Sequence, residues 1–159
     1  MPFSSKKLNK FLIFKLPSAW ICGVRVKTIG KNHCTTTVKH RWINQNPFKS
    51  MFWAVQGMAA ELSTGVLVMQ EIQKSGKKIS MLVISNKAAF VKKATGKITF
   101  TCSDGNSITK AIDQTLKTGE GQTCWMHSQG VNETNEVVST FDFEWTVKVR
   151  ALYSVKSKK

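Results

Sequence analysis

Glu61 is the side chain whose position in the sequence most strongly suggests chemistry. It lies near the middle of an apolar stretch between Met51 and Met69. Burying an unpaired carboxylate is costly, so the centre of a helix rarely holds one without a reason. Such a group can act as a general base or as a nucleophile. It could equally be a structural carboxylate that accepts hydrogen bonds from Thr64, from a strand N–H group or from a partner subunit.

The chain of 159 residues is strongly basic, with a net charge of +15. The charge is also uneven, because ten Lys or Arg residues precede Glu61 whereas no Asp or Glu does. A basic surface attracts polyanions such as nucleic acid, anionic lipid or a phosphorylated ligand such as coenzyme A. Scattered lysines can also serve solubility alone, and the sequence has no tight arginine-rich block. Both interpretations stay open.

The spacing of cysteine and histidine argues against a metal site. The four cysteines lie far apart, without a Cys-x-x-Cys pair: Cys22, Cys34, Cys102 and Cys124. The three histidines, His33, His40 and His127, do not have metal-ligand spacing either. We therefore expect free thiols, a reducing cytoplasmic location, and no bound metal or cofactor. A disulfide framework is the less favoured alternative.

Two segments faintly resemble membrane-directed sequences. Three lysines precede the apolar residues 11–14, but Lys15 and Pro17 interrupt that run, so a cleaved signal peptide is not expected. The stretch 51–69 approaches the roughly 20 residues of a membrane span. Glu61 lies inside it, and a carboxylate at mid-bilayer costs about 3 kcal/mol. A buried helix of a soluble domain is the better interpretation.

Periodicity divides the chain into helices and strands. Apolar residues recur near helical spacing over residues 6–16. A second helix must begin after Pro47; it covers the largely apolar residues 51–69, and Ser50 is its expected N-cap. A shorter helix is predicted to begin at a cap on Ser107. Alternation with a period of two predicts strands over residues 22–28, 34–42, 79–91, 97–102, 122–127 and 137–153.

The order of these elements predicts a single α+β domain over residues 1–159. The helix 51–69 is apolar nearly all round, and such a helix is buried on most sides. A flat sheet cannot cover it, so long antiparallel strands must curl around it. Gly57 and Gly65 give this helix a small-residue side, which would let another backbone pass close by.

Two segments carry a resemblance to a known family. They are Asn46-Pro47-Phe48-Lys49-Ser50-Met51-Phe52 at the start of the long helix and Ala60-Glu61-Leu62-Ser63-Thr64-Gly65 at its centre. Both resemble the hotdog-fold acyl-CoA thioesterase superfamily, in particular its phenylacetate-degradation type and an uncharacterised branch beside it. Residues 90–96 and 143–147 resemble later strands of the same superfamily. The resemblance implies a hotdog fold, in which a curved antiparallel sheet of about six strands wraps one central helix, here with a short N-terminal helix added.

The resemblance also implies an active site at the start of that helix. In these thioesterases an Asn precedes the helix and an acidic residue lies fifteen positions later, as Asn46 and Glu61 do here. A backbone N–H eight positions before the acid polarises the thioester carbonyl, and Trp53 holds that position. Glu61 would then be the general base or nucleophile. Asn46 would orient the water or the carbonyl, although it could also simply form the turn before Pro47.

The helix start departs from the family pattern. Many members have His-Gly-Gly where this chain has Phe52-Trp53-Ala54, so the Trp53 side chain could narrow the site. The predicted substrate-binding residues are Phe52, Lys49, Ser63, Thr64, Lys92 and Lys93. The lysines among them would meet the nucleotide phosphates. Ser63 and Thr64 could instead make packing contacts or local hydrogen bonds.

Three functions follow from these features. The first, which the resemblance implies, is hydrolysis of an acyl thioester of coenzyme A or acyl-carrier protein. The resemblance also implies a homodimer or a dimer of dimers, and coenzyme A would be part of the substrate. The second is a non-catalytic hotdog protein that binds lipid or acyl thioester. The third is a basic nucleic-acid-binding module, whose affinity would fall steeply with salt. The sequence lacks the paired aromatic and basic signature of common RNA-binding sheets, which disfavours the third.

Overall fold

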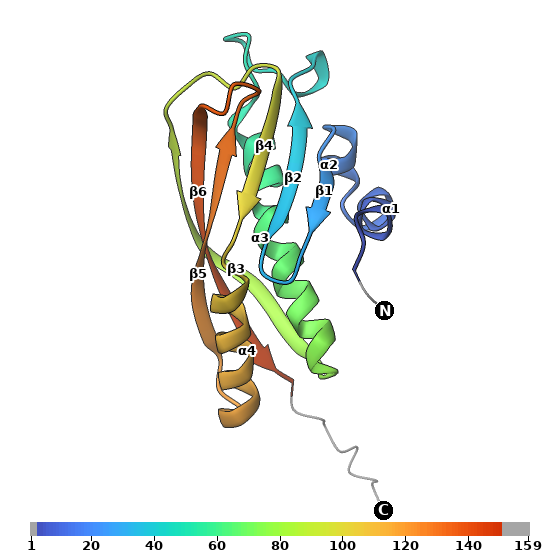
Figure 1. Cartoon of the computed structure of the whole chain (residues 1–159), viewed down its shortest axis with the longest axis vertical. Helices are drawn as coiled ribbons and strands as arrows, with labels where there is room; N and C mark the ends of the chain where they lie inside the picture. Colours follow the sequence, from blue (N-terminus) through green and yellow to red (C-terminus); the bar gives the residue numbers. More distant parts are fainter. Residues whose placement is uncertain (1–2, 151–159) are drawn as a thin grey trace, which may run out of the picture.

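A six-stranded antiparallel sheet curls around one long helix in the computed structural model, which describes residues 3–150 (Figure 1). The helices are α1 Ser5–Lys15, α2 Pro17–Ile21, the 3₁₀ helix η1 Trp42–Asn44, α3 Trp53–Ser75 and α4 Gly105–Thr118. The strands are β1 Arg25–Ile29, β2 Cys34–Lys39, β3 Ile79–Phe90, β4 Lys97–Cys102, β5 Gln122–Val131 and β6 Val137–Val149. The predicted α+β class, curved sheet, long helix and short N-terminal helix are confirmed.

The boundaries of several elements differ from the prediction. Helix α3 starts at Trp53 rather than Met51, with Phe52 at the N-cap position. Ser50 is therefore not the cap, and its hydroxyl instead hydrogen-bonds with the Asn46 side chain. At the other end α3 continues past Met69 until a left-handed Gly76 terminates it.

Other differences lie outside the central helix. Pro17 does end α1, but it also begins the short helix α2, since proline is well suited to a first helical turn. Strand β2 ends at Lys39, and the exposed Trp42 belongs to η1 instead of the strand. Helix α4 begins at Gly105, with Asp104 rather than Ser107 at the N-cap position. The predicted end of the last strand, residues 151–153, lies outside the described residues.

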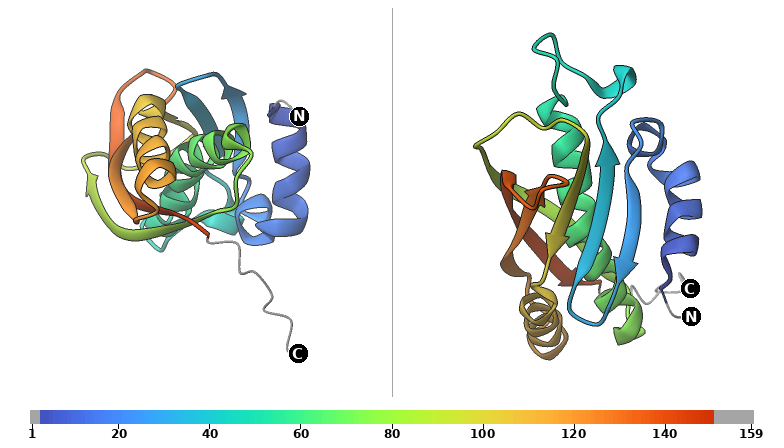
Figure 2. Two further views of the ribbon diagram at one scale, coloured as in Figure 1. Left: turned by 90° about the horizontal axis from the view of Figure 1, so that it is seen from below. Right: turned by 45° about the horizontal axis from the view of Figure 1, so that its top comes forward.

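The sheet has the strand order β1-β2-β4-β5-β6-β3, and each neighbouring pair is antiparallel. Seen from below, it bends around α3, while α4 lies against β5, β6 and α3 (Figure 2). The pairing of two long strands is interrupted by register shifts. One lies between Val83 and Ser85 in β3, and the other between Gly130 and Val131 in β5. Such shifts bend and twist a sheet, which allows it to wrap the helix.

Aromatic side chains of β6 cover the small-residue side of α3. A Cβ atom added at Gly65 would lie 3.2 Å from the Trp145 ring, and one at Gly57 would lie 3.5 Å from Phe141. Aromatic rings therefore pack against these glycines. The sequence had suggested that another backbone would pass there instead. The Trp145 indole N–H also donates a buried hydrogen bond of 2.9 Å to the Thr64 hydroxyl.

The two edges of the sheet differ in whether their backbone groups have hydrogen-bond partners. At the β1 edge, the Asn9 side chain of α1 donates to the Val26 carbonyl and accepts from the Val26 N–H, both at 2.9 Å. At the other edge, β3 pairs with β6 on one side and, within residues 3–150, with nothing on the other. This strand of 12 residues exposes Leu82 and Ile84. A long, apolar, open edge is a template for pairing with another chain.

Replacing Thr64 by Val should destabilise the fold by about 1–3 kcal/mol, because the Trp145 N–H would remain buried without an acceptor. Thr64→Ser keeps the hydroxyl and should cost less. The measurement is the free energy of unfolding in urea. Thr123→Val, at an exposed position of β5, is the matched control, and an equal loss in both Val variants would contradict the role of the hydrogen bond.

Candidate active site

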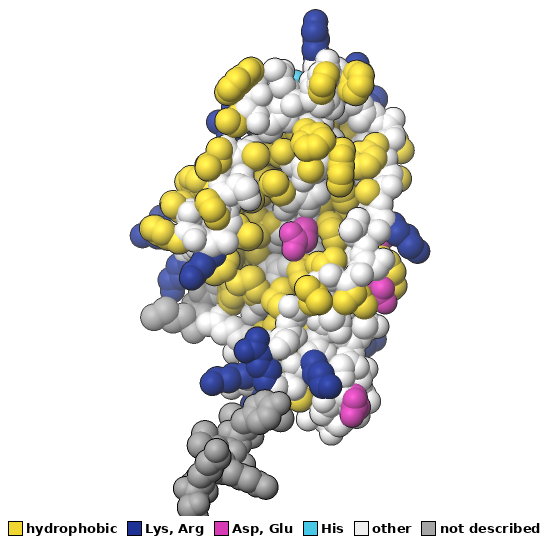
Figure 3. All heavy atoms as spheres, turned by 180° about the vertical axis from the view of Figure 1, so that it is seen from behind, with side chains coloured by type: hydrophobic (Ala, Val, Ile, Leu, Met, Phe, Trp, Pro, Cys, Tyr) yellow, Lys and Arg dark blue, Asp and Glu magenta, His cyan; other side chains and the backbone are white. Residues whose placement is uncertain are grey.

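Glu61 lies on the side of α3 that faces the open β3 edge of the sheet. Its side chain borders a pocket of about 330 Å³. The other residues that line this pocket are mostly apolar: Trp53, Ala54, Gly57, Met58, Val83, Asn86, Phe141 and Phe143. Figure 3 shows a face of the molecule on which hydrophobic side chains gather around an acidic one. Within the described residues, no hydrogen bond or ion pair engages the Glu61 carboxylate.

The apolar surroundings raise the pKa of the Glu61 carboxyl above its ordinary value, because they deprive the charged form of hydration. The loss of hydration is partial, since the side chain remains exposed to solvent on one side in the single chain. A carboxylate with a raised pKa holds a proton more readily at neutral pH. That property suits a group that must accept a proton from water.

Two residues of the first turn of α3 that line the same pocket carry N–H groups not used within the helix. The N–H groups of Val55 and Gln56 bond to the Phe52 carbonyl at 3.1 and 3.3 Å. In the part of the chain that the structure describes, the N–H groups of Trp53 and Ala54 have no acceptor. Both residues line the pocket of Glu61. A carboxylate and a helix N-terminus therefore meet at one cavity, an arrangement that can polarise a carbonyl and activate water.

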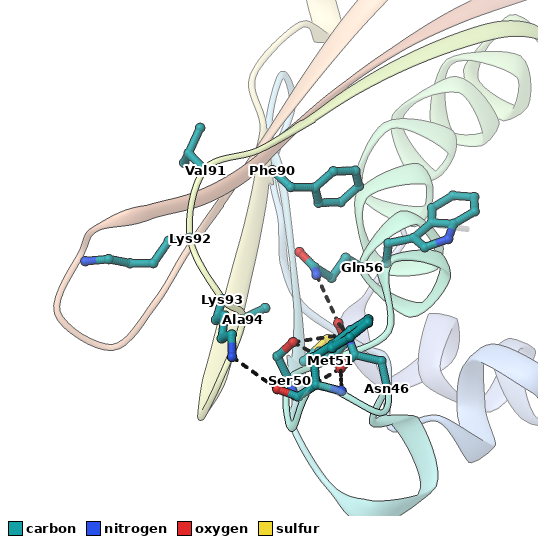
Figure 4. Close-up of a pocket in the computed structure, with 11 residues that line it drawn as sticks. Asn46, Ser50, Met51, Gln56, Phe90, Val91, Lys92, Lys93 and Ala94 are labelled. Carbon is teal, nitrogen blue, oxygen red and sulfur yellow. Dashed lines mark hydrogen bonds between the residues drawn. The ribbon is translucent and has the colours of Figure 1, made fainter.

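Asn46 organises the loop that leads into α3 (Figure 4). Its Oδ1 accepts hydrogen bonds from the N–H groups of Phe48 and Ser50, at 2.9 and 3.2 Å. Its Nδ2 donates to the Ser50 hydroxyl at 3.0 Å and to the Met51 carbonyl at 3.4 Å. The amide is thus engaged at both ends by its own loop, which matches the turn-forming alternative for this residue.

A second pocket, of about 450 Å³, opens beside this loop. It is lined by Asn46, Phe48, Ser50, Met51, Trp53, Gln56, Phe90, Val91, Lys92, Lys93 and Ala94. Trp53 lines both pockets and is more than half exposed. Asn46 and Glu61 consequently border different pockets of the single chain, with Trp53 between them.

Gln56 is a residue of this region that the sequence reasoning did not identify as part of a site. Its amide is buried, donates to the Met51 carbonyl at 3.3 Å and accepts from the Ser139 hydroxyl at 2.8 Å. Gln56 and Phe90 come from α3 and from the end of β3 and project into the space between these elements (Figure 4). A polar residue in an apolar helix, five positions before Glu61, was the available signal.

Lys92 and Lys93 both line the second pocket, but their ammonium groups have different partners. Lys92 forms an ion pair of 2.5 Å with Glu136. Hydrogen bonds from Lys92, Asn132 and Thr134 lower the pKa of Glu136 to about 2. Lys93 donates to the Phe48 carbonyl at 3.3 Å. Of the other predicted binding residues, Lys49 and Phe52 are exposed and, within residues 3–150, border neither pocket.

Ser63 and Thr64 face the sheet. The Ser63 hydroxyl bonds to the Ala60 carbonyl at 2.7 Å and to the Ser128 hydroxyl at 2.8 Å. The Thr64 hydroxyl donates to the backbone carbonyl of Glu61, not to its carboxylate, at 2.9 Å. Both side chains are fully buried. The structure therefore places them away from the pockets, in local hydrogen bonds of the core.

The family model for the domain of unknown function DUF4442 matches residues 4–147. The chain belongs to the DUF4442 family. It has no sequence match among curated proteins.

Solved structures resemble this DUF4442 chain at low sequence identity. A Pseudomonas aeruginosa protein of unknown function, described as a probable thioesterase, is 18% identical with a TM-score of 0.80, covering 94% of this chain and 99% of that one. A Chlorobaculum tepidum protein of unknown function is 16% identical with a TM-score of 0.79, covering 92% and 94%. A Haemophilus influenzae thioesterase is 13% identical with a TM-score of 0.73, covering 97% and 96%. At these identities the likeness shows the fold, and the predicted hotdog fold is confirmed.

Glu61→Gln should stabilise the protein at neutral pH and have little effect near pH 4. The raised pKa means that folding favours the protonated carboxyl. Its contribution to stability is complete below the unfolded pKa of about 4.3 and is lost as the pH rises through the folded pKa. Glutamine mimics the neutral form, so its advantage should grow as the pH rises.

The measurement is the free energy of unfolding of both proteins between pH 4 and pH 8. Glu71→Gln is the matched control, because Glu71 lies on the same helix but forms an ion pair with Lys74. A Glu61→Gln advantage that stayed constant with pH would contradict the raised pKa.

Proposed function

We propose that this protein hydrolyses acyl thioesters carried by coenzyme A or acyl-carrier protein. One observation carries the proposal: an unpaired carboxylate with a raised pKa borders the same pocket as Trp53 and Ala54, the two residues whose helix N–H groups have no acceptor within residues 3–150. The thioesterase descriptions of the Pseudomonas and Haemophilus proteins with this fold support it.

The proposed reaction places the thioester carbonyl oxygen at the N–H groups of Trp53 and Ala54. Glu61 removes a proton from water while the water oxygen adds to the carbonyl carbon. The negative charge that develops on the carbonyl oxygen is stabilised by the two donors and by the partial positive charge of the helix N-terminus. The intermediate then collapses, the carbon–sulfur bond breaks, and the proton passes to the departing thiolate. Direct attack by the Glu61 carboxylate is the alternative route.

Asn46 takes a positioning role in this proposal. Its hydrogen bonds fix the loop that precedes α3, and that loop sets where the first N–H groups of the helix point. The neighbouring pocket holds the carrier side of the substrate. Lys93 is the better candidate for a phosphate contact there, because the charge of Lys92 is already paired with Glu136.

A second copy of the chain is proposed to complete the site by pairing along β3. Val83 and Asn86 of this strand line the Glu61 pocket, so a partner at the edge would close that pocket. The exposed Leu82 and Ile84 would be buried by the same contact. Antiparallel pairing of two β3 strands about a two-fold axis presents the same surface on both copies, as a closed dimer requires.

Glu61→Gln should lower kcat for acyl-CoA hydrolysis by about 10²–10⁴-fold and change KM little, because it removes the proton acceptor without removing binding surface. The measurement is steady-state release of free thiol across a panel of acyl-CoAs and acyl-carrier proteins. Glu71→Gln on the same helix should keep full activity.

Unchanged turnover in Glu61→Gln would remove this carboxylate from the mechanism. If the unaltered protein bound acyl thioesters but hydrolysed none of the panel, the non-catalytic alternative, a hotdog protein that binds lipid or acyl thioester, would replace the proposal.

The double variant Leu82→Lys, Ile84→Lys should convert a dimer into a 17.8 kDa monomer. Like charges would face each other across the two-fold axis, and lysine at a strand edge opposes pairing. Light scattering coupled to size-exclusion chromatography measures the mass, and hydrolysis should fall in parallel. Leu116→Lys, at an exposed position of α4, controls for added charge. A monomeric unaltered protein would contradict the proposed pairing.

A further inference from the structure

We propose that the outer face of α1 docks onto an anionic membrane surface. This face, called the α1 face below, is defined by Lys6, Lys10, Ile13 and Phe14, and it continues into Leu16 after the helix. It lies apart from both pockets of the candidate active site.

The orientation of α1 is fixed by its inner side. Leu8 and Leu12 are buried against the body of the protein, with 4% and 1% of their surfaces exposed. Asn9 makes its two hydrogen bonds to Val26 of strand β1. The helix therefore cannot turn over to hide the opposite side, and that side remains available to a partner.

The opposite side combines apolar and basic residues at helical spacing. Lys10 and Phe14 are four positions apart, and Lys10 and Ile13 are three apart, so each pair shares one face of the helix. Phe14 is 79% exposed, and Ile13 and Leu16 are about 40% exposed. Ile21, at the end of the adjoining α2, is 61% exposed. Phe14 in particular is covered very little by the rest of the chain.

The positive charge of the α1 face limits which class of partner can bind to it. Helix α1 contains four lysines and no acidic residue, and no Asp or Glu occurs before Glu61. A second copy of the chain would bring these lysines against their own equivalents, so self-association is disfavoured. A nucleic-acid duplex would attract the lysines through its phosphates but would leave Ile13, Phe14 and Leu16 without an apolar partner.

An anionic lipid surface can contact both the apolar and the basic residues of the α1 face. Apolar side chains of an interfacial helix enter the boundary between headgroups and acyl chains, and the lysine side chains extend to the negatively charged headgroups. Within the described residues, no helix is long and apolar enough to cross a bilayer. The contact we infer is therefore a reversible one in which α1 lies along the surface.

The test is sedimentation of the full chain with vesicles of phosphatidylcholine alone or with 30 mole per cent phosphatidylglycerol, roughly the charge density of an anionic leaflet. Binding is expected with the anionic vesicles only, and it should weaken at high salt. Phe14→Ser should weaken it about tenfold by removing buried apolar surface. Lys6→Gln and Lys10→Gln should each weaken it about fivefold.

Helix α4 supplies a matched control set, because it lies apart from α1 in both views of Figure 2 and has its own exposed lysines and leucine. Lys110→Gln, Lys117→Gln and Leu116→Ser should leave vesicle binding unchanged. Phe14→Leu, which keeps the apolar surface, should bind like the unaltered chain.

The vesicle experiments can overturn the proposal in several ways. Equal binding to neutral and anionic vesicles would do so, as would equal losses from the α1 and α4 variants, or vesicle binding that does not respond to Phe14→Ser. A Phe14→Ser variant that instead lost self-association in light scattering, or lost binding to RNA, would assign the α1 face to another partner and would likewise reject a membrane contact.

Discussion

The burial of helix α3 is the constraint on which the other features of this molecule depend. The helix is apolar on nearly all sides, so most of its surface must be removed from water. The sheet meets this demand by curving, with register shifts in β3 and β5 and with β6 aromatic rings seated over Gly57 and Gly65. The buried hydrogen bond between Trp145 and Thr64 helps to set how α3 is rotated about its own axis inside the sheet.

That rotation decides which part of α3 remains accessible. Ser63 and Thr64 turn toward the sheet, whereas Glu61 turns toward the gap beside the edge strand β3. Because the gap is lined by apolar groups, the carboxylate loses hydration and its pKa rises. The start of the same helix lies at the same gap, so Glu61 shares its pocket with Trp53 and Ala54, whose N–H groups have no acceptor within residues 3–150.

The two sheet edges give the molecule two different surfaces. Asn9 of α1 satisfies the Val26 backbone at the β1 edge, which covers part of that edge and holds α1 with Lys10 and Phe14 outward. The β3 edge keeps its unpaired backbone and exposes Leu82 and Ile84. The basic, apolar α1 face suits an anionic surface, and the largely uncharged β3 edge suits another copy of the chain.

Local patterns in the sequence predicted the helices and strands, the family resemblance predicted the hotdog architecture, and a single acidic residue drew attention to Glu61. Alternating residues predicted β6, a long apolar stretch after Pro47 predicted α3, and a lone carboxylate in that stretch singled out Glu61, since each signal depends on near neighbours in the chain. The sequence could not show that Asn46 is engaged by its own loop, that Gln56 bonds to Ser139, or that Thr64 supports Trp145. These facts depend on contacts between distant segments and on the rotation of α3 inside the sheet. Only the packed tertiary structure determines that rotation, because it is set by the fit of side chains far apart in the sequence.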